Sequence, residues 1–367
     1  MDKLQQARAQ ISQIDGQMAE LFRQRMEAVK LVAEHKKEHG LPILDPQREA
    51  ELLAKNSLRI EDEELREFYV LYLEHTMAVS RAYQEKLLSG MRVAYSGTEG
   101  AFAHIAAGRI FPGSNRLSYG DFKSAYDAVV RGDCDCAVLP LENSYAGEVD
   151  QVIDLTFFGS LYINGVYELA ITQNLMALPG TQRQQITSVV SHPQALNQCA
   201  DFLRENGLES MEFSNTAAAA AYVAKQGRKD LAAIASAETA ALYGLEILER
   251  NINASHSNTT RFGVFSRTEN KALGGRMGDH FILLFTVKNV AGSLARAIDV
   301  IGKYGFNMRC LRSRPVKDLL WEYYFYLEVE GDIRSAAGEE MLQNLGAFCD
   351  RLRVAGTFSN HCLLEED

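Results

Sequence analysis

The first forty residues carry the most regular hydrophobic pattern of the chain. Apolar side chains recur every three or four positions, which predicts one long amphipathic helix from Asp2 to about His39. Basic residues interrupt the apolar stripe: Arg25 falls at its centre, Lys36 lies on nearly the same side, and Arg8 lies at its edge. Cations that point into a helical core need an anion, either a ligand or the carboxylates of a partner. A coiled coil whose basic side chains bend out to solvent is the alternative interpretation.

Two shorter helical patterns follow after a break that contains glycine and proline. Asp45 and Pro46 supply an N-cap and a first-turn proline for the second helix. A third helix is predicted from the acidic residues at 61–64, which suit a helix N-terminus, to about Leu88. Three helices of this kind cannot enclose a core by themselves. We therefore expect residues 1–89 to form an all-α, intertwined dimer.

Beyond Gly90 the pattern changes to short apolar runs that alternate with amphipathic helices. The first run, Met91–Tyr95, is followed by a glycine-containing loop and a helix from Ala101, an arrangement that points backbone N–H groups at an anion. Further strands are predicted at 134–140, 165–178, 187–191, 231–236 and 260–267, and helices at 194–205 and 216–226. This alternation predicts an α/β region over 91–267 with a mainly parallel sheet, divided into two lobes.

The last part of the chain follows a glycine-rich linker at 268–279. Its predicted elements are strand 280–287, helix 293–303, strand 306–314, strand 319–328, helix 333–345 and strand 351–357. This βαββαβ order is that of the α+β ferredoxin-like sandwich, so we expect residues 279–360 to form a third domain.

Composition and charge narrow the possible functions. The chain has 367 residues and a formal net charge of −10, which argues against nucleic-acid binding. No apolar run approaches the roughly 18 residues of a membrane span, and the charged start of the chain is unlike a signal peptide. We therefore expect a cytoplasmic protein without a membrane partner. The six cysteines lack a zinc-binding spacing, which predicts reduced thiols and no metal.

Eight polar residues of the helical region form one constellation across the three helices. They are Arg8, Arg25, Lys36, Asp45, Arg48, Glu49, Ser80 and Gln84. In type and spacing they resemble the all-helical chorismate mutases. That reaction rearranges chorismate to prephenate by a pericyclic shift without a nucleophile, a proton transfer or a cofactor. Its catalysis therefore consists of positioning and of electrostatic stabilisation of the breaking ether bond.

The resemblance implies a role for each residue of this set. Planar guanidinium groups suit the two substrate carboxylates, so Arg8, Arg25 and Arg48 would bind them. The catalytic groups at the ether oxygen would be Lys36 and Gln84. The remaining roles would be binding of the ring hydroxyl by Glu49 and support of the pocket by Asp45 and Ser80. Arg8 would reach the partner's site. For any one residue alone, a solvated helix face is the simpler explanation.

Four marks in the α/β region resemble the prephenate dehydratases. They are Gly97–Phe102, Pro140–Gly147, Ser191–Gln194 followed by Gln198, and Asn258–Phe262, which contains Thr-Arg-Phe. The resemblance covers about 91–267 and implies a two-lobed fold like that of periplasmic binding proteins. Two of the marks follow strand ends, where α/β proteins place their ligands. The glycine loop departs from the family, with Thr98 in place of proline and Ala101 in place of a hydroxyl residue.

The family reaction removes carbon dioxide and water from prephenate and gives phenylpyruvate. Aromatisation of the ring drives it, so the enzyme has to orient the substrate and assist departure of the hydroxyl group. By resemblance, Thr260 would hydrogen-bond or protonate that hydroxyl. The substrate would be held by Asn143, Ser144, Ser191 and Gln198, and Arg261 would support the site or meet a carboxylate. Glu142 is an alternative proton source if burial raises its pKa.

The C-terminal region resembles the ACT regulatory domains, which bind phenylalanine at a dimer interface. The matching pieces are Asn289–Leu294, with Gly292, Ser293 and Leu294, and Arg312–Pro315, with Ser313, Arg314 and Pro315. Both depart from the family. Ser293 replaces alanine, and Arg312 replaces a glutamate, which reverses the charge beside the expected amino-acid site. A purely structural dimerisation module is the alternative.

Together the three regions predict a bifunctional enzyme, a chorismate mutase followed by a prephenate dehydratase. It would act without a cofactor, would be a homodimer or larger homo-oligomer, and would be inhibited by phenylalanine. One alternative is a non-catalytic sensor of aromatic metabolites, which would have no need for Lys36 or Gln84. A second alternative, hydride transfer to a nicotinamide cofactor, lacks the expected G-x-G-x-x-G loop after a strand.

Overall fold

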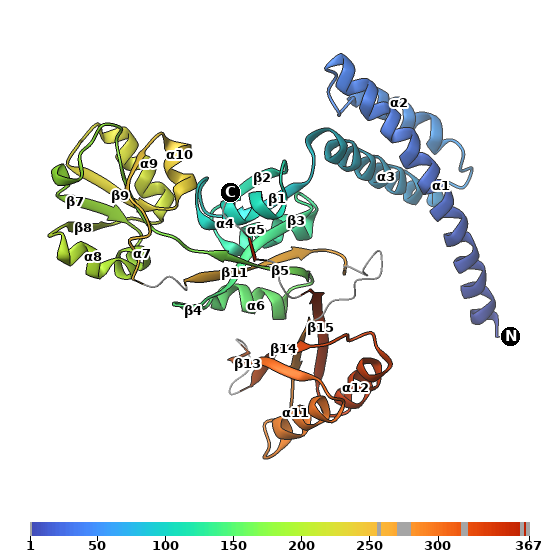
Figure 1. Ribbon diagram of the computed structural model, residues 1–367. Coiled ribbons are helices and arrows are strands. Elements are labelled where there is room, and N and C mark those ends of the chain that lie inside the picture. The colour runs from blue at the N-terminus through green and yellow to red at the C-terminus, as the bar shows by residue number, and fades with distance from the viewer. Residues whose placement is uncertain (1, 255–257, 270–279, 317–321, 360–362, 365–367) are drawn as a thin grey trace. The chain divides into compact units, whose positions relative to one another are not determined.

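The structure is a computed structural model that describes residues 2–254, 258–269, 280–316, 322–359 and 363–364 (Figure 1). The chain divides into two compact units, Met1–Met91 and Arg92–Asp367. Within the described residues, no helix is both long and apolar enough to cross a membrane. The cysteines in the described part of the chain are all free thiols, and burial raises the pKa of Cys199 to about 12.

The first unit consists of three helices at the predicted positions. They are α1 (Lys3–His39), α2 (Pro46–Ser57) and α3 (Glu63–Ser89). Gly40 ends α1 in the left-handed conformation, with φ of 63°, and the carboxylate of Asp45 caps α2 by accepting from the backbone N–H of Arg48. Asp62 caps α3 in the same way, through the N–H of Leu65. Local capping therefore sets where these helices begin and end.

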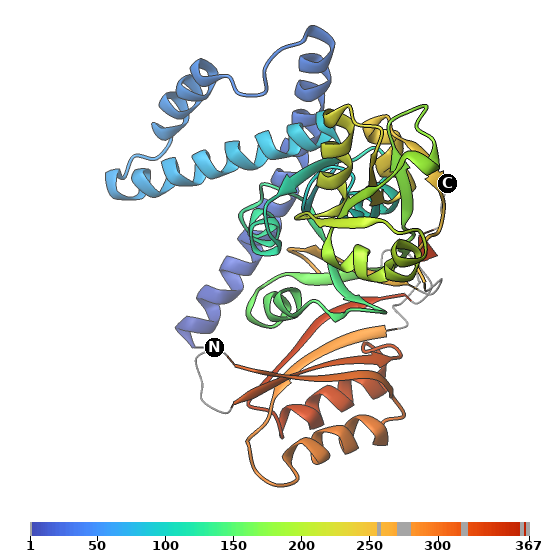
Figure 2. The same ribbon diagram turned by 90° about the vertical axis from the view of Figure 1, so that its left-hand side faces the viewer.

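One copy of this unit encloses very little core. Its buried apolar side chains in the described residues are Val29, Ala33 and Met77. Large apolar residues of α1 and α3 remain open to solvent, with Leu21 63% and Phe68 64% exposed. The N-terminal half of α1 extends beyond α2 and α3 in both views (Figures 1 and 2). The helices thus present an apolar surface that the helical unit itself does not cover.

The second unit contains two sheets, and the first continues into the C-terminal region. Its first part has the order β5-β11-β3-β1-β2. These strands are β1 (Arg92–Ser96), β2 (Asn115–Tyr119), β3 (Cys136–Asn143), β5 (Tyr162–Ala170) and β11 (Thr259–Ser266). The helices in contact with them are α4 (Phe102–Ile110), α5 (Phe122–Arg131) and α6 (Asp150–Phe158). The sheet is mixed and not mainly parallel, because β11 is antiparallel to both β3 and β5.

The second sheet has the order β10-β6-β9-β7-β8. Its strands are β6 (Asn174–Ala177), β7 (Ser188–Ser191), β8 (Glu209–Glu212), β9 (Leu231–Ala235) and β10 (Glu246–Glu249). Its helices are α7 (Pro193–Gln198), α8 (Ala200–Glu205), α9 (Thr216–Gln226) and α10 (Ala237–Tyr243). The strand predicted at 165–178 is in fact two strands, because the chain leaves the first sheet after Ala170 and enters the second at Asn174. The predicted division into two lobes is confirmed.

The C-terminal region has the predicted βαββαβ order. Its elements are β12 (His280–Thr286), α11 (Ser293–Lys303), β13 (Asn307–Pro315), β14 (Tyr323–Glu330), α12 (Ala336–Gly346) and β15 (Arg351–Phe358). The start predicted for the third strand, 319–321, lies outside the described residues. The strand order is β13-β14-β12-β15, and β15 joins β5 through one parallel pair, Gly356 with Ile163. A Cβ on Gly356 would lie 1.9 Å from the carbonyl oxygen of Ile163, so this junction requires glycine.

Candidate active sites

The helical unit holds a cavity of about 190 Å³ between its three helices. Seven of the eight residues of the predicted constellation line it, namely Arg25, Lys36, Asp45, Arg48, Glu49, Ser80 and Gln84. The helical spacing brings side chains from α1, α2 and α3 to one point although they are up to 59 positions apart in the sequence. The cavity wall therefore carries a concentration of basic and amide groups that suits a small anion.

The cations of this cavity are held in place by polar contacts. The Arg25 guanidinium donates to the Ser80 hydroxyl and lies 3.5 Å from the carbonyl oxygen of Thr76. The Lys36 ammonium donates to the carbonyl oxygen of Ile43 at 2.6 Å. Both side chains are half-buried, so the hydrogen bonds fix charges that would otherwise be costly to remove from water. They are preorganised for an anionic ligand.

Gln84 is the residue whose surroundings point most directly to a ligand. Its side chain is 7% exposed, and its Nε2 lies 3.4 Å from the carbonyl oxygen of Ser80. Its Oε1 is buried without a hydrogen-bond partner among the described residues. A buried amide that lacks a partner costs free energy, which a ligand in the cavity can recover.

One charged residue of the described cavity lining was not predicted from the sequence. Arg81, on α3, forms an ion pair with the carboxylate of Glu49 on α2. The sequence did contain a hint of its role, because Arg81 is a basic residue directly after Ser80, which was predicted to line the site. Arg48 is less fixed, because its side chain is 70% exposed and its nearest carboxylate, on Glu51, lies 3.7 Å away.

Arg8 does not line the cavity of its own chain. It is exposed, and it precedes Arg25 by 17 residues of one helix, which corresponds to about 25 Å along the helix axis. An arginine side chain cannot bridge that distance. The predicted role for Arg8 therefore requires a second copy of the chain.

A second cavity, of about 640 Å³, is lined by both lobes of the α/β region. It brings together all four marks noted in the sequence. The lining residues from them include Ala101, Phe102, Asn143, Ala146, Gly147, His192, Gln194, Gln198, Thr260 and Phe262. Ala101 is the N-cap of α4 but offers no side-chain cap, so the glycine loop contributes backbone groups and not a hydroxyl.

Thr260 and Asn143 form the polar centre of this cavity. They lie opposite each other on β11 and β3, and Asn143 Nδ2 donates to the Thr260 hydroxyl at 2.9 Å. The orientation of the Asn143 amide is fixed because its Oδ1 accepts from the backbone N–H groups of Tyr145 and Ala146. The Thr260 hydroxyl therefore accepts one hydrogen bond, and its own hydrogen has no acceptor within the described residues. Thr260 is only 8% exposed, which favours donation to a bound molecule.

The opposite wall comes from the second lobe. Gln198 accepts from Gln173 Nε2 at 3.4 Å, and Gln173 Oε1 is buried without a hydrogen-bond partner in the described part of the chain. Gln173 was not predicted; it follows β5 at the crossing into the second lobe. The His192 ring caps α7 by accepting from the backbone N–H of Gln194 at 3.2 Å.

Two predicted substrate-binding serines do not line this cavity. Ser191 is fully buried, and its hydroxyl donates to the carbonyl oxygen of Ile234 at 2.7 Å. The Ser144 hydroxyl accepts from the backbone N–H of Thr259 at 3.0 Å. Both serines contact the backbone near the cavity, so their arrangement supports a structural role and not the predicted contact with the substrate.

Arg261 also lies outside the cavity. Successive residues of a strand point to opposite faces, so Thr260 and Phe262 face the cavity and Arg261 faces away. Its guanidinium bonds to Glu142 at 2.6 Å and to Glu328 of β14 at 2.9 Å. Arg261 therefore joins the α/β region to the C-terminal region, which agrees with the predicted supporting role and not with a contact to a substrate carboxylate.

Glu142 is not a proton donor either. Its burial opposes ionisation, but the hydrogen bond from Arg261 and the charge of Arg312 outweigh it and hold the pKa of Glu142 below its ordinary value. The carboxyl group is therefore ionised at neutral pH, contrary to the alternative considered from the sequence.

The residues of the expected phenylalanine motif lie on two elements. Gly292, with φ of 82°, is the N-cap of α11, where Ser293 and Leu294 begin the helix. Ser313, Arg314 and Pro315 end β13. Arg314 is already bonded to carboxylates of the α/β region, to Asp150 at 2.5 Å and to Asp154 at 2.8 Å.

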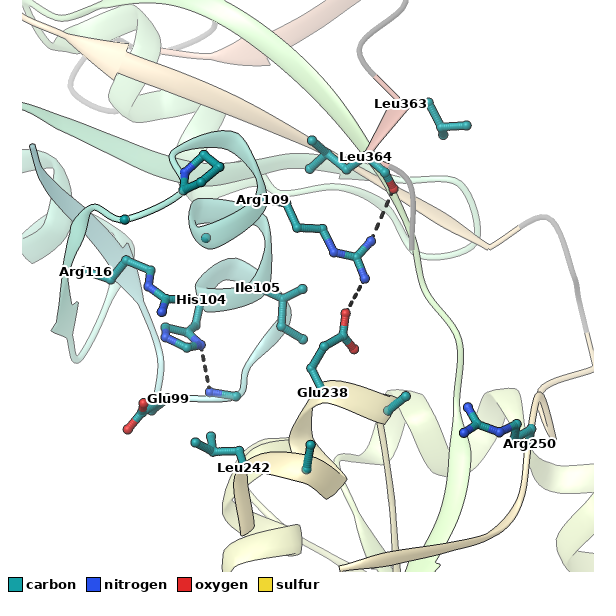
Figure 3. Close-up of a pocket in the computed structure, with 16 residues that line it drawn as sticks. Glu99, His104, Ile105, Arg109, Arg116, Glu238, Leu242, Arg250, Leu363 and Leu364 are labelled. Atoms are coloured by element: carbon teal, nitrogen blue, oxygen red, sulfur yellow. Dashed lines mark hydrogen bonds and ion pairs between the residues drawn. The ribbon is translucent and has the colours of Figure 1, made fainter. Parts of the chain in front are cut away.

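A further cavity, of about 1030 Å³, is lined by Glu99 and Gly100 of the glycine loop but by none of the predicted catalytic or binding residues (Figure 3). Arg109 of α4 extends there between the Glu238 carboxylate of α10 and the carbonyl oxygen of Leu364. His104 accepts from the backbone N–H of Gly100 at 3.1 Å, and burial lowers the pKa of its ring. These contacts join the two lobes to the described end of the chain, away from the cavity that holds Thr260.

Comparisons with known proteins agree with this division. Residues 7–85 match the family model of chorismate mutase type II, and residues 93–270 match that of prephenate dehydratase. The bifunctional chorismate mutase/prephenate dehydratase of Aquifex aeolicus (strain VF5) is 30% identical over the full length of both chains. A solved structure of GqqA, described as a novel type of quorum quenching acylase, is 31% identical with a TM-score of 0.68 and covers 74% of this chain and 98% of its own. The prephenate dehydratase of Arthrobacter aurescens in complex with L-Phe is 26% identical with a TM-score of 0.67 and covers 73% and 90%.

The class defined by these features is that of enzymes in which a helical mutase is fused to a two-lobed dehydratase. The relative from Aquifex aeolicus matches this chain from end to end. This chain belongs to the bifunctional chorismate mutase/prephenate dehydratase family, and the two activities predicted from the sequence are confirmed.

Proposed function

We propose that the cavity of the helical unit rearranges chorismate to prephenate and that the cavity between the lobes converts prephenate to phenylpyruvate. The observation that carries this proposal is the convergence of seven predicted residues on the first cavity and of all four sequence marks on the second. The domains would extend over about 1–89, 91–267 and 279–360.

In the helical cavity, the guanidinium groups of Arg25 and Arg48 bind the carboxylates of chorismate. Lys36 through its Nζ and Gln84 through its Nε2 donate to the ether oxygen, where negative charge grows as its bond to the ring breaks. Glu49 accepts from the ring hydroxyl, while Asp45 caps α2 and Ser80 holds Arg25. No proton or electron is exchanged with the protein, so this set of fixed charges is sufficient and no cofactor is needed.

A homodimer completes this cavity. The exposed apolar faces of α1 and α3 supply the surface for a second copy, and Arg8 then enters the partner's cavity as a further carboxylate ligand. The single chain supports this arrangement because it buries so few of its helical apolar residues.

In the cavity between the lobes, the bond from the ring to its carboxylate breaks and carbon dioxide leaves. The electron pair enters the ring, the carbon–oxygen bond of the ring hydroxyl breaks, and the leaving oxygen takes the Thr260 proton to give water. Thr260 then recovers a proton from solvent. Asn143 orients the Thr260 hydroxyl by donating to it, and Gln198, with Gln173, orients the substrate from the other lobe.

The C-terminal region acts as an ACT domain that binds phenylalanine and lowers dehydratase activity in the cytoplasm. The support is its βαββαβ order and its Gly292–Leu294 and Ser313–Pro315 segments. The similar dehydratase of Arthrobacter aurescens was solved in complex with L-Phe.

The test incubates the purified full-length protein with chorismate alone and follows chorismate, prephenate and phenylpyruvate. Conversion through prephenate to phenylpyruvate is expected. Unchanged chorismate would contradict the whole proposal, and accumulation of prephenate would contradict its second half. A phenylalanine titration in the same assay tests the regulatory part, which is wrong if neither binding nor inhibition occurs at millimolar concentration.

A further inference from the structure

The C-terminal region contacts the α/β region through two arginines on one face of β13. Arg312 and Arg314 are two residues apart in the strand, so both side chains leave the same face. Arg312 bonds to the Glu142 carboxylate and, at 2.6 Å, to that of Glu148. Arg314 bonds to Asp150 at 2.5 Å and to Asp154 at 2.8 Å. All four carboxylates belong to one segment, residues 142–154, which we call the rim segment.

The rim segment forms part of the cavity that holds Thr260. Six consecutive residues, 146–151, line that cavity. Glu142 directly precedes Asn143, which donates to the Thr260 hydroxyl. Each carboxylate that Arg312 or Arg314 binds therefore lies close to the cavity lining. Glu148 and Asp150 line the cavity, Glu142 is the neighbour of a lining residue, and Asp154 lies one helical turn from Asp150.

The pairs Arg312–Glu142 and Arg314–Asp154 are buried enough to fix geometry, whereas the side chain of Asp150 is 65% exposed. The side chains of Arg312, Arg314 and Asp154 are 11%, 17% and 10% exposed. Asp154 also accepts from the Tyr324 hydroxyl at 2.8 Å, so β14 contributes to the same cluster. Removing one partner from a buried pair leaves an unpaired charge, and the remaining groups must move to find solvent.

Arg312 is also the residue that departs from the expected glutamate of the ACT motif. A glutamate at 312 would place a third carboxylate beside Glu142 and Glu148, whereas arginine pairs with both. Its guanidinium is therefore committed to the rim segment and is not available to an amino acid. The reversal of charge at position 312 therefore attaches β13 to the rim segment in this chain.

We infer that Arg312 and Arg314 are positioning residues of the dehydratase reaction, which hold the rim segment in the geometry that the cavity requires. Arg312 sets the position of Asn143, and through it that of the Thr260 hydroxyl. Arg314 holds the start of α6, whose first residues close one side of the cavity. This inference rests on the proposed function of that cavity, and it makes the C-terminal region part of the active-site support even when no effector is bound.

The test compares three full-length variants in steady-state assays with prephenate. Arg312→Gln is expected to lower kcat about tenfold with KM changed less than twofold, because it disturbs Asn143 and Thr260. Arg314→Gln is expected to raise KM about fivefold with a smaller change in kcat, because it loosens the cavity wall. Arg312→Lys, which keeps the charge, is expected to recover part of kcat.

Arg309→Gln is the matched control, since Arg309 lies on the same strand but pairs with Glu330 of β14, at 3.6 Å. Its dehydratase constants should equal those of the parent, and the mutase activity should be unchanged in all four proteins. The inference is overturned if Arg312→Gln and Arg314→Gln keep both constants within twofold. It is equally overturned if Arg309→Gln causes the same loss, or if mutase and dehydratase activities fall together.

A second measurement separates this inference from the proposed function. Amide hydrogen exchange in the rim segment should become at least tenfold faster in Arg312→Gln and Arg314→Gln than in the parent and Arg309→Gln. If the parent does not consume prephenate, the proposed function fails, and the kinetic part of the inference falls with it. Unchanged exchange in the two variants overturns the inference even where the parent is fully active.

Discussion

In the helical unit, the side chains that line the cavity project from helices whose apolar faces are largely exposed. In the two-lobed region, by contrast, the central polar residues Asn143 and Thr260 project from buried strands. Asn143 donates a hydrogen bond to Thr260 and accepts one from the backbone. The first cavity gathers the cations Arg25, Lys36, Arg48 and Arg81 and two carboxylates. The described lining of the second cavity contains no lysine or arginine and combines apolar side chains with amides, hydroxyls and two carboxylates.

The difference follows from the two reactions. A pericyclic shift of a dianion needs fixed charges and nothing that transfers a proton, so long basic side chains on helices are sufficient. Loss of carbon dioxide and hydroxide needs one correctly aimed hydroxyl, which short side chains on adjacent strands hold more tightly. The proposed mechanism therefore makes the first cavity depend on a second copy of the chain, and the second on the C-terminal region of its own chain.

The largest effect is expected when Thr260 loses its hydroxyl. Thr260→Ala should lower the dehydratase kcat roughly 1000-fold, because general acid assistance is worth about 10²–10⁴. The mutase activity should be unchanged, and Thr260→Ser should keep much of the dehydratase activity. Both activities are measured on the same sample. Equal loss of both would show that the two cavities are not independent.

A slightly smaller effect is expected in the helical cavity. Lys36→Ala should lower the mutase kcat by about 10²–10³, the range observed when one donor to a developing negative charge is removed. Formation of phenylpyruvate from added prephenate should remain at the parental rate. Arg23→Ala is the control, since Arg23 is on the same helix but pairs with Glu20 and Glu27 at the surface. A loss in Arg23→Ala as large as in Lys36→Ala would count against the assignment.

The dependence on a second copy can be tested by complementation. Arg8→Ala and Lys36→Ala should each have low mutase activity when expressed alone. When both chains are co-expressed, mixed dimers have one cavity with both residues intact, so about a quarter of the parental activity should return. Activity no higher than that of the separate variants would mean that Arg8 does not serve the partner's cavity.

The smallest effect concerns pH. The pKa of Glu142 is lower in the folded chain than in the unfolded chain, so the unfolded state binds more protons. Its contribution to stability is therefore complete above the ordinary glutamate pKa and is lost as the pH falls through the folded value. Glu142→Gln should show a melting temperature a few degrees less sensitive to acidification from about pH 5 to about pH 3 than the parent. Identical acid sensitivity in both proteins would contradict the pairing of Glu142 with Arg261 and Arg312.

The sequence predicted the helical cavity more completely than the cavity between the lobes. Helical periodicity places Arg25, Lys36, Ser80 and Gln84 on defined faces, so the spacing of these residues is enough to group the side chains that share a face. The period-two rule for strands would likewise have excluded Arg261, which is the neighbour of an inward-facing threonine. The resemblance to a family motif led to its inclusion.

Other features depend on contacts between distant residues. The ionised state of Glu142 follows from Arg261 and from Arg312, which lies 170 positions later, and no local pattern brings these residues together. The predicted strand at 165–178 was too long, because the chain changes sheets at residues 171–173. The residue types at these positions also occur in strands, so the sequence does not mark the change. Gln173 was missed for the same reason, since its role arises only from that crossing.

Gly356 has a consequence for how this chain could be divided or recombined. The two parts of the long sheet meet at the pair Gly356–Ile163, and Leu363 and Leu364 pair with the same strand, β5. A chain shortened before residue 280 would uncover the edge of β5 and invite intermolecular strand pairing. A C-terminal region transplanted from another protein would need a glycine at this position to be accepted. The C-terminal region is therefore not a detachable module, and any evolutionary exchange of it must preserve this one residue.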